Sequence, residues 1–220
     1  EYSPNGTISI LTNSQNTAPD LPILSGGISL PSYSVSTTYN IDDIKFTHRA
    51  MSLLSINPYL ASVYKDGDTT IYVEANNRMH LYPDGHLSYS VADASGGIPV
   101  LPHSDSTEQA AMLSMLESVR RIVFPIWENL SSDMVKLSLS SVEQKDGVYT
   151  VYFDAYIGGC YISRGDTAAG AAMRGNGKIT NISIYPLTIR RQGDVSTLPY
   201  KQAQAAAHDN AVLRIHYILK

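Results

Sequence analysis

The feature of this sequence that most constrains its fold is the alternation of apolar and polar side chains within residues 134–190. Successive side chains of a strand point to opposite faces, so the pattern predicts strands with one buried face. The turn sequences at residues 144–147 and 175–177 contain Asp-Gly and Asn-Gly, which favour tight hairpins. We therefore predict a meander of about four antiparallel strands. Its first hairpin would bury Val135, Leu137, Leu139, Ser141, Tyr149, Val151, Phe153, Ala155 and Ile157.

A second, shorter sheet is predicted upstream of this meander. Apolar residues alternate in residues 71–75, directly after a polar turn sequence. A hairpin follows at residues 79–91 and folds at residues 83–85 (Pro-Asp-Gly), which pairs Leu81 with Leu87. The buried face would carry Met79, Leu81, Leu87, Tyr89 and Val91, and the exposed face His80, Tyr82, His86 and Ser88.

Helix caps and apolar periodicity predict three helices. Asn40 would cap the first helix, which ends before Asn57 and the proline that follows it. Ser106 begins a capping-box pattern before the second helix, and Pro125 would end or kink that helix. The third helix would contain the alanine-rich residues 202–208, and a closing strand would follow it.

Together these elements predict an α+β fold of antiparallel sheets, each covered by a helix, and their order indicates two related units. Residues 1–39 are rich in Ser, Thr and Pro and nearly uncharged, which favours an extended arm or tether. Residues 8–11 of that arm would also suit pairing with a sheet edge. We expect the first unit at residues 40–130 and the second unit, a sheet of about four or five strands with a helix, at residues 131–220.

Composition excludes some classes of protein and favours others. The 220 residues include 16 Lys and Arg and 20 Asp and Glu, a net charge of −4 with no run of either sign. A nucleic-acid surface needs clustered cations, so we exclude that class. The single cysteine, Cys160, excludes an internal disulfide. Charged residues make up 16%, below the typical 25% or so, and 15 tyrosines stand beside 3 phenylalanines, as is common outside the cytoplasm.

The sequence contains no apolar run near the roughly 20 residues that a transmembrane helix needs. It begins at Glu1 instead of an initiating Met. We therefore expect that a signal or membrane anchor precedes this segment in the native protein.

No set of residues forms a recognisable catalytic or metal-binding motif, so we predict neither an enzyme nor a cofactor. His80 and His86 would project from one face of their hairpin, but zinc needs three or four ligands and the spacing supplies no third. His103, Asp105 and Ser106 have the side-chain types of a hydrolytic triad. Such near neighbours in sequence do not reach the geometry of a triad unaided, and Ser106 is already explained as a helix cap.

Two further candidates have simpler structural explanations. Cys160 follows Gly159 at the end of a strand, and the sequence places no base beside it that would activate a thiolate. The glycine-rich residues 158–178 end in Lys178, but a phosphate loop needs GxxxxGK followed by Ser or Thr, between a strand and a helix. Here Ile179 follows the lysine and strands flank the segment, so hairpin turns account for the glycines.

A surface for a partner or ligand is predicted near a tyrosine-bearing strand face. Pro186 cannot donate a ladder hydrogen bond within residues 182–189, which indicates an edge strand or a bulge. The tyrosines expected beside this accessible edge are Tyr152, Tyr156 and Tyr185. The alternative is that the N-terminal arm shields the edge.

Three stretches of the sequence, taken in order, carry a resemblance to a known family. They are TIYVEANNRMHLYPDGHLSYS, YTVYFDAYIGGCYIS and GNGKITNISIYPL, and a predicted helix with Lys201, Gln202 and Ala203 follows them. In this order they resemble the extracytoplasmic part of the YycH/YycI family, which regulates the WalK/WalR two-component system of Gram-positive bacteria from the membrane. The resemblance covers residues 70–219.

The resemblance implies a similar α+β architecture, an N-terminal transmembrane helix and no enzymatic activity. It also implies control of a sensor kinase by contacts in the membrane and outside it, and it offers no active-site residue to carry over. This sequence departs from the family pattern because it lacks the transmembrane helix and carries the Ser- and Thr-rich arm.

These observations support three hypotheses of function. The leading one is an extracytoplasmic, natively membrane-anchored interaction domain that regulates a membrane protein or a homologous regulator, with a sensor histidine kinase as the implied target. The second is a secreted module for cell-wall glycan or peptide, in which sugar rings stack on Tyr152 and Tyr156. The third is a hydrolase built around His103 or Cys160.

Overall fold

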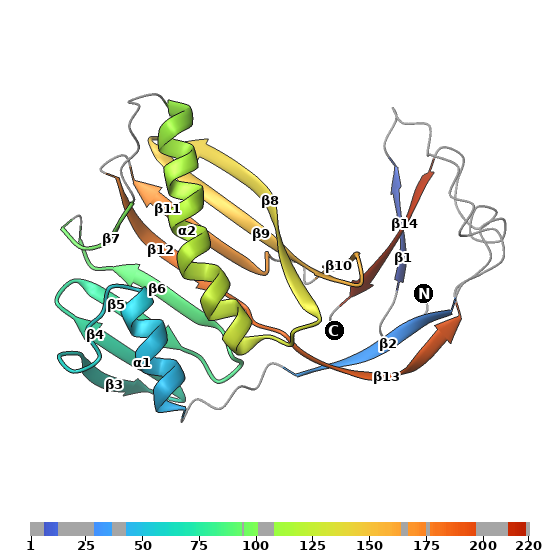
Figure 1. The fold of residues 1–220 in the computed structure, drawn as a ribbon, viewed down its shortest axis with the longest axis horizontal. Helices are drawn as coiled ribbons and strands as arrows, with labels where there is room; N and C mark the ends of the chain where they lie inside the picture. The colour runs from blue at the N-terminus through green and yellow to red at the C-terminus, as the bar shows by residue number, and fades with distance from the viewer. Residues whose placement is uncertain are drawn as a thin grey trace. The chain divides into compact units, whose positions relative to one another are not determined.

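The structure is a computed structural model that describes residues 7–12, 29–36, 43–93, 95–100, 108–163, 167–174, 177–196 and 211–218. Strands outnumber helices in the described part of the chain, and the fold is α+β with mainly antiparallel sheet (Figure 1). Contacts between Cα atoms divide the chain into two compact units. Unit 1 comprises Glu1–Val35, Tyr156–Asp166 and Ile189–Lys220, and unit 2 comprises Ser36–Ala155 and Thr167–Thr188.

The sheet of unit 2 joins the two groups of strands that the sequence suggests. Its strand order is β8-β9-β11-β12-β6-β5-β4-β3, and β7 pairs with β12. The upstream hairpin and the meander therefore share one sheet, because β6 pairs with β12, with Tyr89 opposite Ile182. The strands are β3 (Ser62–Asp66), β4 (Thr69–Glu74), β5 (Asn77–Leu81), β6 (Leu87–Val91), β7 (Ile98–Pro99), β8 (Val135–Lys145), β9 (Val148–Ile157), β11 (Ala169–Arg174) and β12 (Lys178–Ile184).

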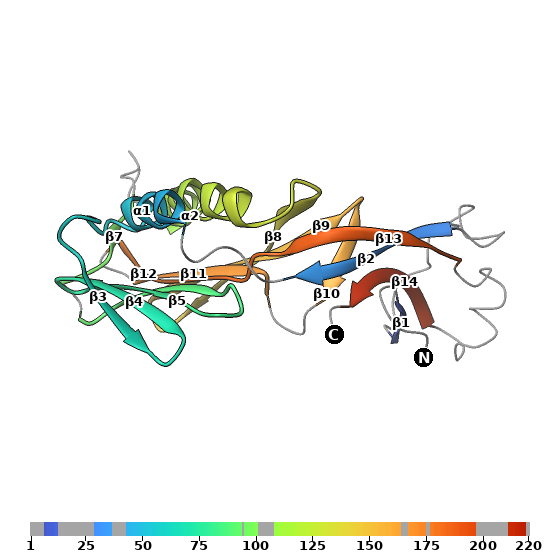
Figure 2. The same ribbon diagram turned by 90° about the horizontal axis from the view of Figure 1, so that it is seen from below.

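Helices α1 (Ile44–Leu53) and α2 (Glu108–Leu130) lie on the same face of this sheet (Figure 2). On the covered face, apolar side chains form rows that run across the strands. Each row forms because residues directly opposite one another on neighbouring strands point to the same side of the sheet. One such row runs from Met79 through Tyr89, Ile182 and Ala171 to Val151, and all five side chains are buried. The core of unit 2 therefore lies between this face and the two helices.

The hairpin predicted at residues 79–91 is confirmed in its register. Leu81 pairs with Leu87 and Met79 with Tyr89, and these four side chains are at most 1% exposed. The four strands of the meander are confirmed as β8, β9, β11 and β12, which neighbour one another in that order in the sheet, although a further strand, β10 (Cys160–Ser163), lies between β9 and β11 in the chain. The turn between β8 and β9 places Asp146 at φ 51° and Gly147 at φ 74°, as a two-residue hairpin turn requires.

Two details of the predicted strands are corrected. Leu139, expected on the buried face, is 46% exposed. The strand expected through Pro186 is two strands, because β12 ends at Ile184 and β13 (Thr188–Ser196) begins after the proline. Proline has no N–H for the ladder, so pairing stops there; β12 itself lies between two strands and is not an edge.

The first helix begins later than predicted. Its N-cap is Asp43, whose carboxylate accepts hydrogen bonds from the backbone N–H groups of Lys45 (3.0 Å) and Phe46 (3.2 Å). An aspartate at this position satisfies orphan N–H groups and suits the positive end of the helix dipole. Asn40, the predicted cap, lies outside the described residues, as does Ser106, the predicted cap of the second helix.

Helix α2 continues past Pro125, so it does not end there, which was one of the two outcomes predicted for this proline. A proline inside a helix costs about 3 kcal/mol because it removes one backbone hydrogen bond and crowds the preceding turn. The last turn buries Ile126, Trp127 and Leu130, and the Trp127 indole donates to the Val135 carbonyl at 3.2 Å. Each such side chain contributes about 1.5–3 kcal/mol when buried, which offsets the cost of the proline.

Unit 1 contains strands from both ends of the chain. Strand β1 (Thr7–Thr12) pairs antiparallel with β14 (Ala211–Ile218), and β10 (Cys160–Ser163) pairs with β14 in parallel. Strand β2 (Ser29–Ser36) pairs with β13. The Ser34 hydroxyl joins that pair: it donates to the Arg190 carbonyl at 3.3 Å and accepts from the Gln192 side chain at 2.7 Å.

The expected divisions of the chain differ from these units. Two segments of the expected arm, residues 1–39, are paired strands, because alternating apolar residues at positions 8–11 suit a sheet edge. Residues 40–130 and 131–220 do not separate, because β12 from the second range lies between β6 and β11 in the sheet of unit 2. The body of the predicted third helix lies outside the described residues; the closing strand is present as β14.

Candidate functional site

Four of the exposed apolar side chains of unit 2 gather in and just before strand β3. Large apolar side chains are exposed at nine described positions, and four of these fall within residues 59–64. Tyr59 is 85% exposed, Leu60 70%, and Val63 and Tyr64 57% each. We call these four residues the β3 surface. Exposed apolar side chains that cluster at one sheet edge indicate a site where another molecule binds.

Strand β3 also offers its backbone. All five of its residues are exposed, and among the described residues β4 is its only strand neighbour. In the β3–β4 register Tyr64 lies opposite Ile71, while Val63 lies opposite Tyr72 on the helix-bearing side. An edge strand presents a row of backbone N–H and C=O groups that accept a further strand. The β3 surface therefore combines apolar contact area with directional backbone hydrogen bonds.

The loop before β3 is held in place by Asn57. The Asn57 side chain accepts from the Tyr59 backbone N–H at 3.0 Å, and its carbonyl accepts from the N–H groups of Leu60 (3.1 Å) and Ala61 (3.0 Å). The N–H of Asn57 in turn donates to the Glu74 carboxylate on β4. These bonds fix the backbone at Tyr59 and Leu60 before any partner arrives, so less conformational entropy is lost on binding.

The sheet face opposite the helices carries two of the three predicted tyrosines. Tyr152 pairs with Gly170, and the same cross-strand row continues through Ser183 and Ser88 to His80. A Cβ atom on Gly170 would lie 3.5 Å from the Tyr152 ring, so the ring packs along the bare backbone of Gly170. Tyr185 belongs to the same face, two residues beyond Ser183 in the chain.

Four rings form a stack at one end of this face. The order is His80, Tyr82, His86, Tyr185, with centroid separations of 6.1, 4.7 and 4.0 Å and interplanar angles of 18°, 15° and 3°. The His86 ring also hydrogen-bonds through Nε2 to the Ser183 hydroxyl at 2.8 Å. Both faces of His86 are therefore covered by tyrosine rings. His80 and His86 do lie in one cluster, as predicted, with Tyr82 between them. Within the described residues, no group of three or more His, Cys, Asp or Glu side chains is placed to hold a metal ion.

The titration of His80 gives a testable pH dependence. Burial lowers the pKa of His80, the positive charge of Arg78 lowers it further, and Asp66 opposes the shift. The unfolded chain protonates this histidine near pH 6.5, before the folded protein does, so protonation favours unfolding. The free energy of unfolding should therefore fall as the pH drops below about 6.5. In urea titrations at neutral and mildly acidic pH, His80→Gln should lose less stability on acidification than the unchanged protein. An equal loss of stability in both proteins would contradict the lowered pKa of His80.

The remaining predicted candidates belong to unit 1 or lie outside the described residues. Tyr156 belongs to unit 1, where its ring meets that of Tyr161 at 5.7 Å. Cys160 is a free, half-buried thiol in the same unit. His103 and Asp105 lie outside the described residues, together with Ser106.

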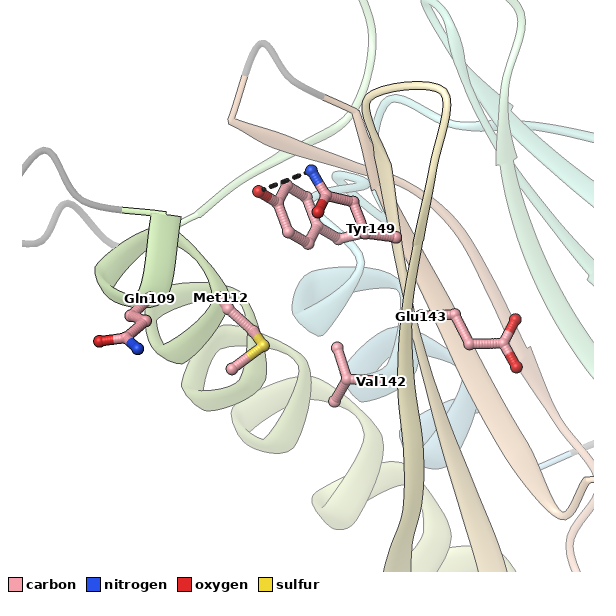
Figure 3. Close-up of a pocket in the computed structure, with 6 residues that line it drawn as sticks. Gln109, Met112, Val142, Glu143 and Tyr149 are labelled. Atoms are coloured by element: carbon pink, nitrogen blue, oxygen red, sulfur yellow. Dashed lines mark hydrogen bonds between the residues drawn. The ribbon is translucent and has the colours of Figure 1, made fainter.

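A small pocket lies between α2 and the β8–β9 hairpin of unit 2 (Figure 3). Its volume is about 180 Å³. Met112 and Val142 point toward one another across it, and Glu143 points away. The Gln144 amide donates to the Tyr149 hydroxyl at 3.2 Å at its rim. The lining residues are Gln109, Met112, Val142, Glu143, Gln144 and Tyr149.

The β3 surface was not predicted from the sequence. The first predicted strand begins only after residues 65–68, and no element was assigned to residues 59–64. A usable signal was present: Tyr59, Leu60, Val63 and Tyr64 are separated from the first helix by a proline and followed by Asp66-Gly67. Gly67 has φ +57° and turns the chain from β3 into β4, so that dipeptide belongs to a hairpin.

No family model, no curated protein and no solved structure matches this chain. The resemblance to the YycH/YycI family therefore stays a prediction. None of the helices in the described part of the chain is long and apolar enough to cross a membrane.

Proposed function

We propose that this chain is an extracytoplasmic interaction domain that regulates a membrane protein by binding it through the β3 surface. The observation that carries the proposal is the coincidence of an edge strand with four exposed apolar side chains, Tyr59, Leu60, Val63 and Tyr64. The domain acts by binding and not by catalysis. The regulated partner is a sensor histidine kinase or a homologous regulator, as the family resemblance implies.

The energetics of the β3 surface support a binding role. Tyrosine is enriched among residues that dominate binding energy, because it supplies a large ring and a polar tip at little cost in conformational entropy. Full burial of a large apolar side chain contributes about 1.5–3 kcal/mol. Burial of Tyr59, Leu60 and Tyr64 together therefore provides several kcal/mol, and the backbone edge of β3 adds orientation.

The proposed location rests on composition. Only 16% of the residues are charged, and 15 tyrosines replace the phenylalanines and charged side chains of a typical cytosolic domain. Attachment to the membrane through a preceding segment follows from the family resemblance. The identity of the captured partner tests both the extracytoplasmic location and the attachment to the membrane.

A photocrosslinking experiment tests the proposal. A photoreactive phenylalanine analogue replaces Tyr64 in the full chain, which is then illuminated in its native cell envelope. We expect a covalent product with an integral membrane protein, identified by mass spectrometry. The matched control carries the analogue at Asn181, an exposed position on β12 of the same unit, and should give no such product. A product of equal yield from both positions, or none from position 64, contradicts the proposal.

A second candidate function is glycan binding at the sheet face opposite the helices. The observation in its favour is the Tyr152 ring, which packs along Gly170 in the same row as Ser183 and Ser88. An aromatic ring beside small hydroxyl side chains suits a sugar ring, whose apolar face stacks and whose hydroxyls form hydrogen bonds. Co-sedimentation with purified peptidoglycan that Tyr152→Ala abolishes, and Asn181→Ala leaves intact, would favour this function over the first.

A further inference from the structure

Strand β8 is the other edge of the sheet in unit 2. It is 11 residues long, and among the described residues β9 is its only strand neighbour. Ser138, Leu139 and Ser140 at its centre are exposed, and Leu139 remains 46% exposed. Long, uncharged edge strands recruit further strands. They are therefore uncommon on proteins whose sheet edges stay unpaired. The centre of β8 has no charge, proline or glycine that would prevent this pairing.

The pocket of Figure 3 opens beside the second half of this edge. Val142 of β8 and Met112 of α2 provide apolar walls that face one another. The volume of about 180 Å³ is comparable with a cavity of roughly 150 Å³ that holds a benzene molecule in another protein. The pocket therefore has room for one aromatic or branched aliphatic side chain. The Gln109 and Gln144 amides add neutral hydrogen-bonding groups to its lining.

Charge at the two ends of β8 further specifies what fits. Lys136 and Lys145 are exposed near opposite ends of the strand, and exposed acidic residues lie close to each in the sequence: Asp133 before Lys136, and Glu143 and Asp146 on either side of Lys145. Glu143 points away from the pocket. A segment with charged residues of both signs at its ends and an uncharged centre would complement this pattern.

From these three observations we propose that β8 and its pocket bind an extended peptide segment of a partner protein. The peptide adds to the outer edge of β8 as a further strand and inserts one aromatic or branched aliphatic side chain between Met112 and Val142. Charged residues of both signs at its ends meet the mixed charge at the two ends of β8. A polypeptide is the occupant because only a backbone offers donors and acceptors at the strand repeat. This site uses the opposite edge of the sheet from β3 and does not depend on the function proposed for that edge.

Selection from a random peptide library tests the site. The whole chain is immobilised and panned against displayed random peptides of about twelve residues, enough to pair along all of β8. Enriched peptides are synthesised and titrated into protein with ¹³C-labelled methionine methyl groups. We expect sequences with one aromatic or branched aliphatic residue in an uncharged centre, and a shift of the Met112 methyl signal. The methyl signal of Met51, fully buried on α1, should stay in place.

Substitutions in the pocket decide whether that binding is the proposed one. Val142→Phe fills the pocket and should weaken binding of the selected peptides by about tenfold or more. The reason is that their aromatic or branched aliphatic side chain can no longer enter the pocket. Val142→Ala keeps the pocket open and should retain binding, so it controls for folding effects at the same position. Leu60→Ser alters only the β3 surface and should leave the affinity unchanged. No enriched peptide, peptides that leave Met112 unshifted, or equal binding to Val142→Phe would each overturn the proposal.

Discussion

Replacing Leu60 and Tyr64 together by serine is expected to weaken binding of the membrane partner to the β3 surface. The affinity should fall by about a hundredfold or more, equivalent to roughly 2.7 kcal/mol. The reason is that these side chains lie at the exposed edge strand and are 70% and 57% exposed in the free domain. They lose contact with water only on binding, so their burial contributes to the affinity and not to folding. Titration of the purified partner, followed by a surface-binding assay, measures the loss.

Two comparisons make this result specific. Leu113→Ser removes an equally apolar side chain, 54% exposed, from α2 and should change the affinity little. The free energy of unfolding of the double variant should stay within about 0.5 kcal/mol per substitution of the original, as is usual for exposed positions. If the double variant lost less than threefold in affinity, or if Leu113→Ser lost as much, the β3 surface would not be the binding site.

Replacing Ile182 by alanine is expected to lower the free energy of unfolding of unit 2 by about 2–5 kcal/mol. Ile182 is 1% exposed at the centre of the sheet and lies beside Tyr89 and Ala171 on the face that the helices cover. Removing its branched side chain loses the transfer free energy of three carbons and leaves a cavity that close-packed neighbours fill only partly. Urea unfolding followed by fluorescence of Trp127, the single tryptophan, reports this change from within unit 2.

The neighbouring residue is the control for this prediction. Asn181 precedes Ile182 on the same strand but points to the opposite face and is exposed. Asn181→Ala should change the free energy of unfolding by no more than about 0.5 kcal/mol. If the two substitutions had equal effects, the helices would not cover the face on which Ile182 lies.

The hairpins show how far local sequence carries a prediction. The residues Pro83-Asp84-Gly85 set both the position of the turn and the pairing of Leu81 with Leu87, since turn chemistry and alternation act over a few residues. The same rules led to β9, whose Val151, Phe153, Ala155 and Ile157 are all buried as predicted. They fell short at Leu139, near the centre of β8, because alternation alone does not tell which face of a strand another element covers.

The candidate site was less accessible to this reasoning. Tyr152 and Tyr185 were chosen for their strand face, and the structure places both on the face of unit 2 opposite the helices. The stacking of Tyr185 on His86 joins residues nearly a hundred positions apart and depends on the pairing of β6 with β12. The β3 surface was missed because an exposed apolar side chain looks the same in sequence as a buried one.

The sequence by itself determined the turns of the two predicted hairpins and the apolar faces of β5, β6 and β9. These features follow from backbone geometry and side-chain alternation between near neighbours, whose energies do not depend on the rest of the chain. Only the tertiary structure decided that β6 meets β12, that both described helices share one face of the sheet of unit 2, and that β3 and β8 are its edges. Those outcomes depend on which apolar faces pack together across long separations, and that choice is made by the summed burial of the whole unit.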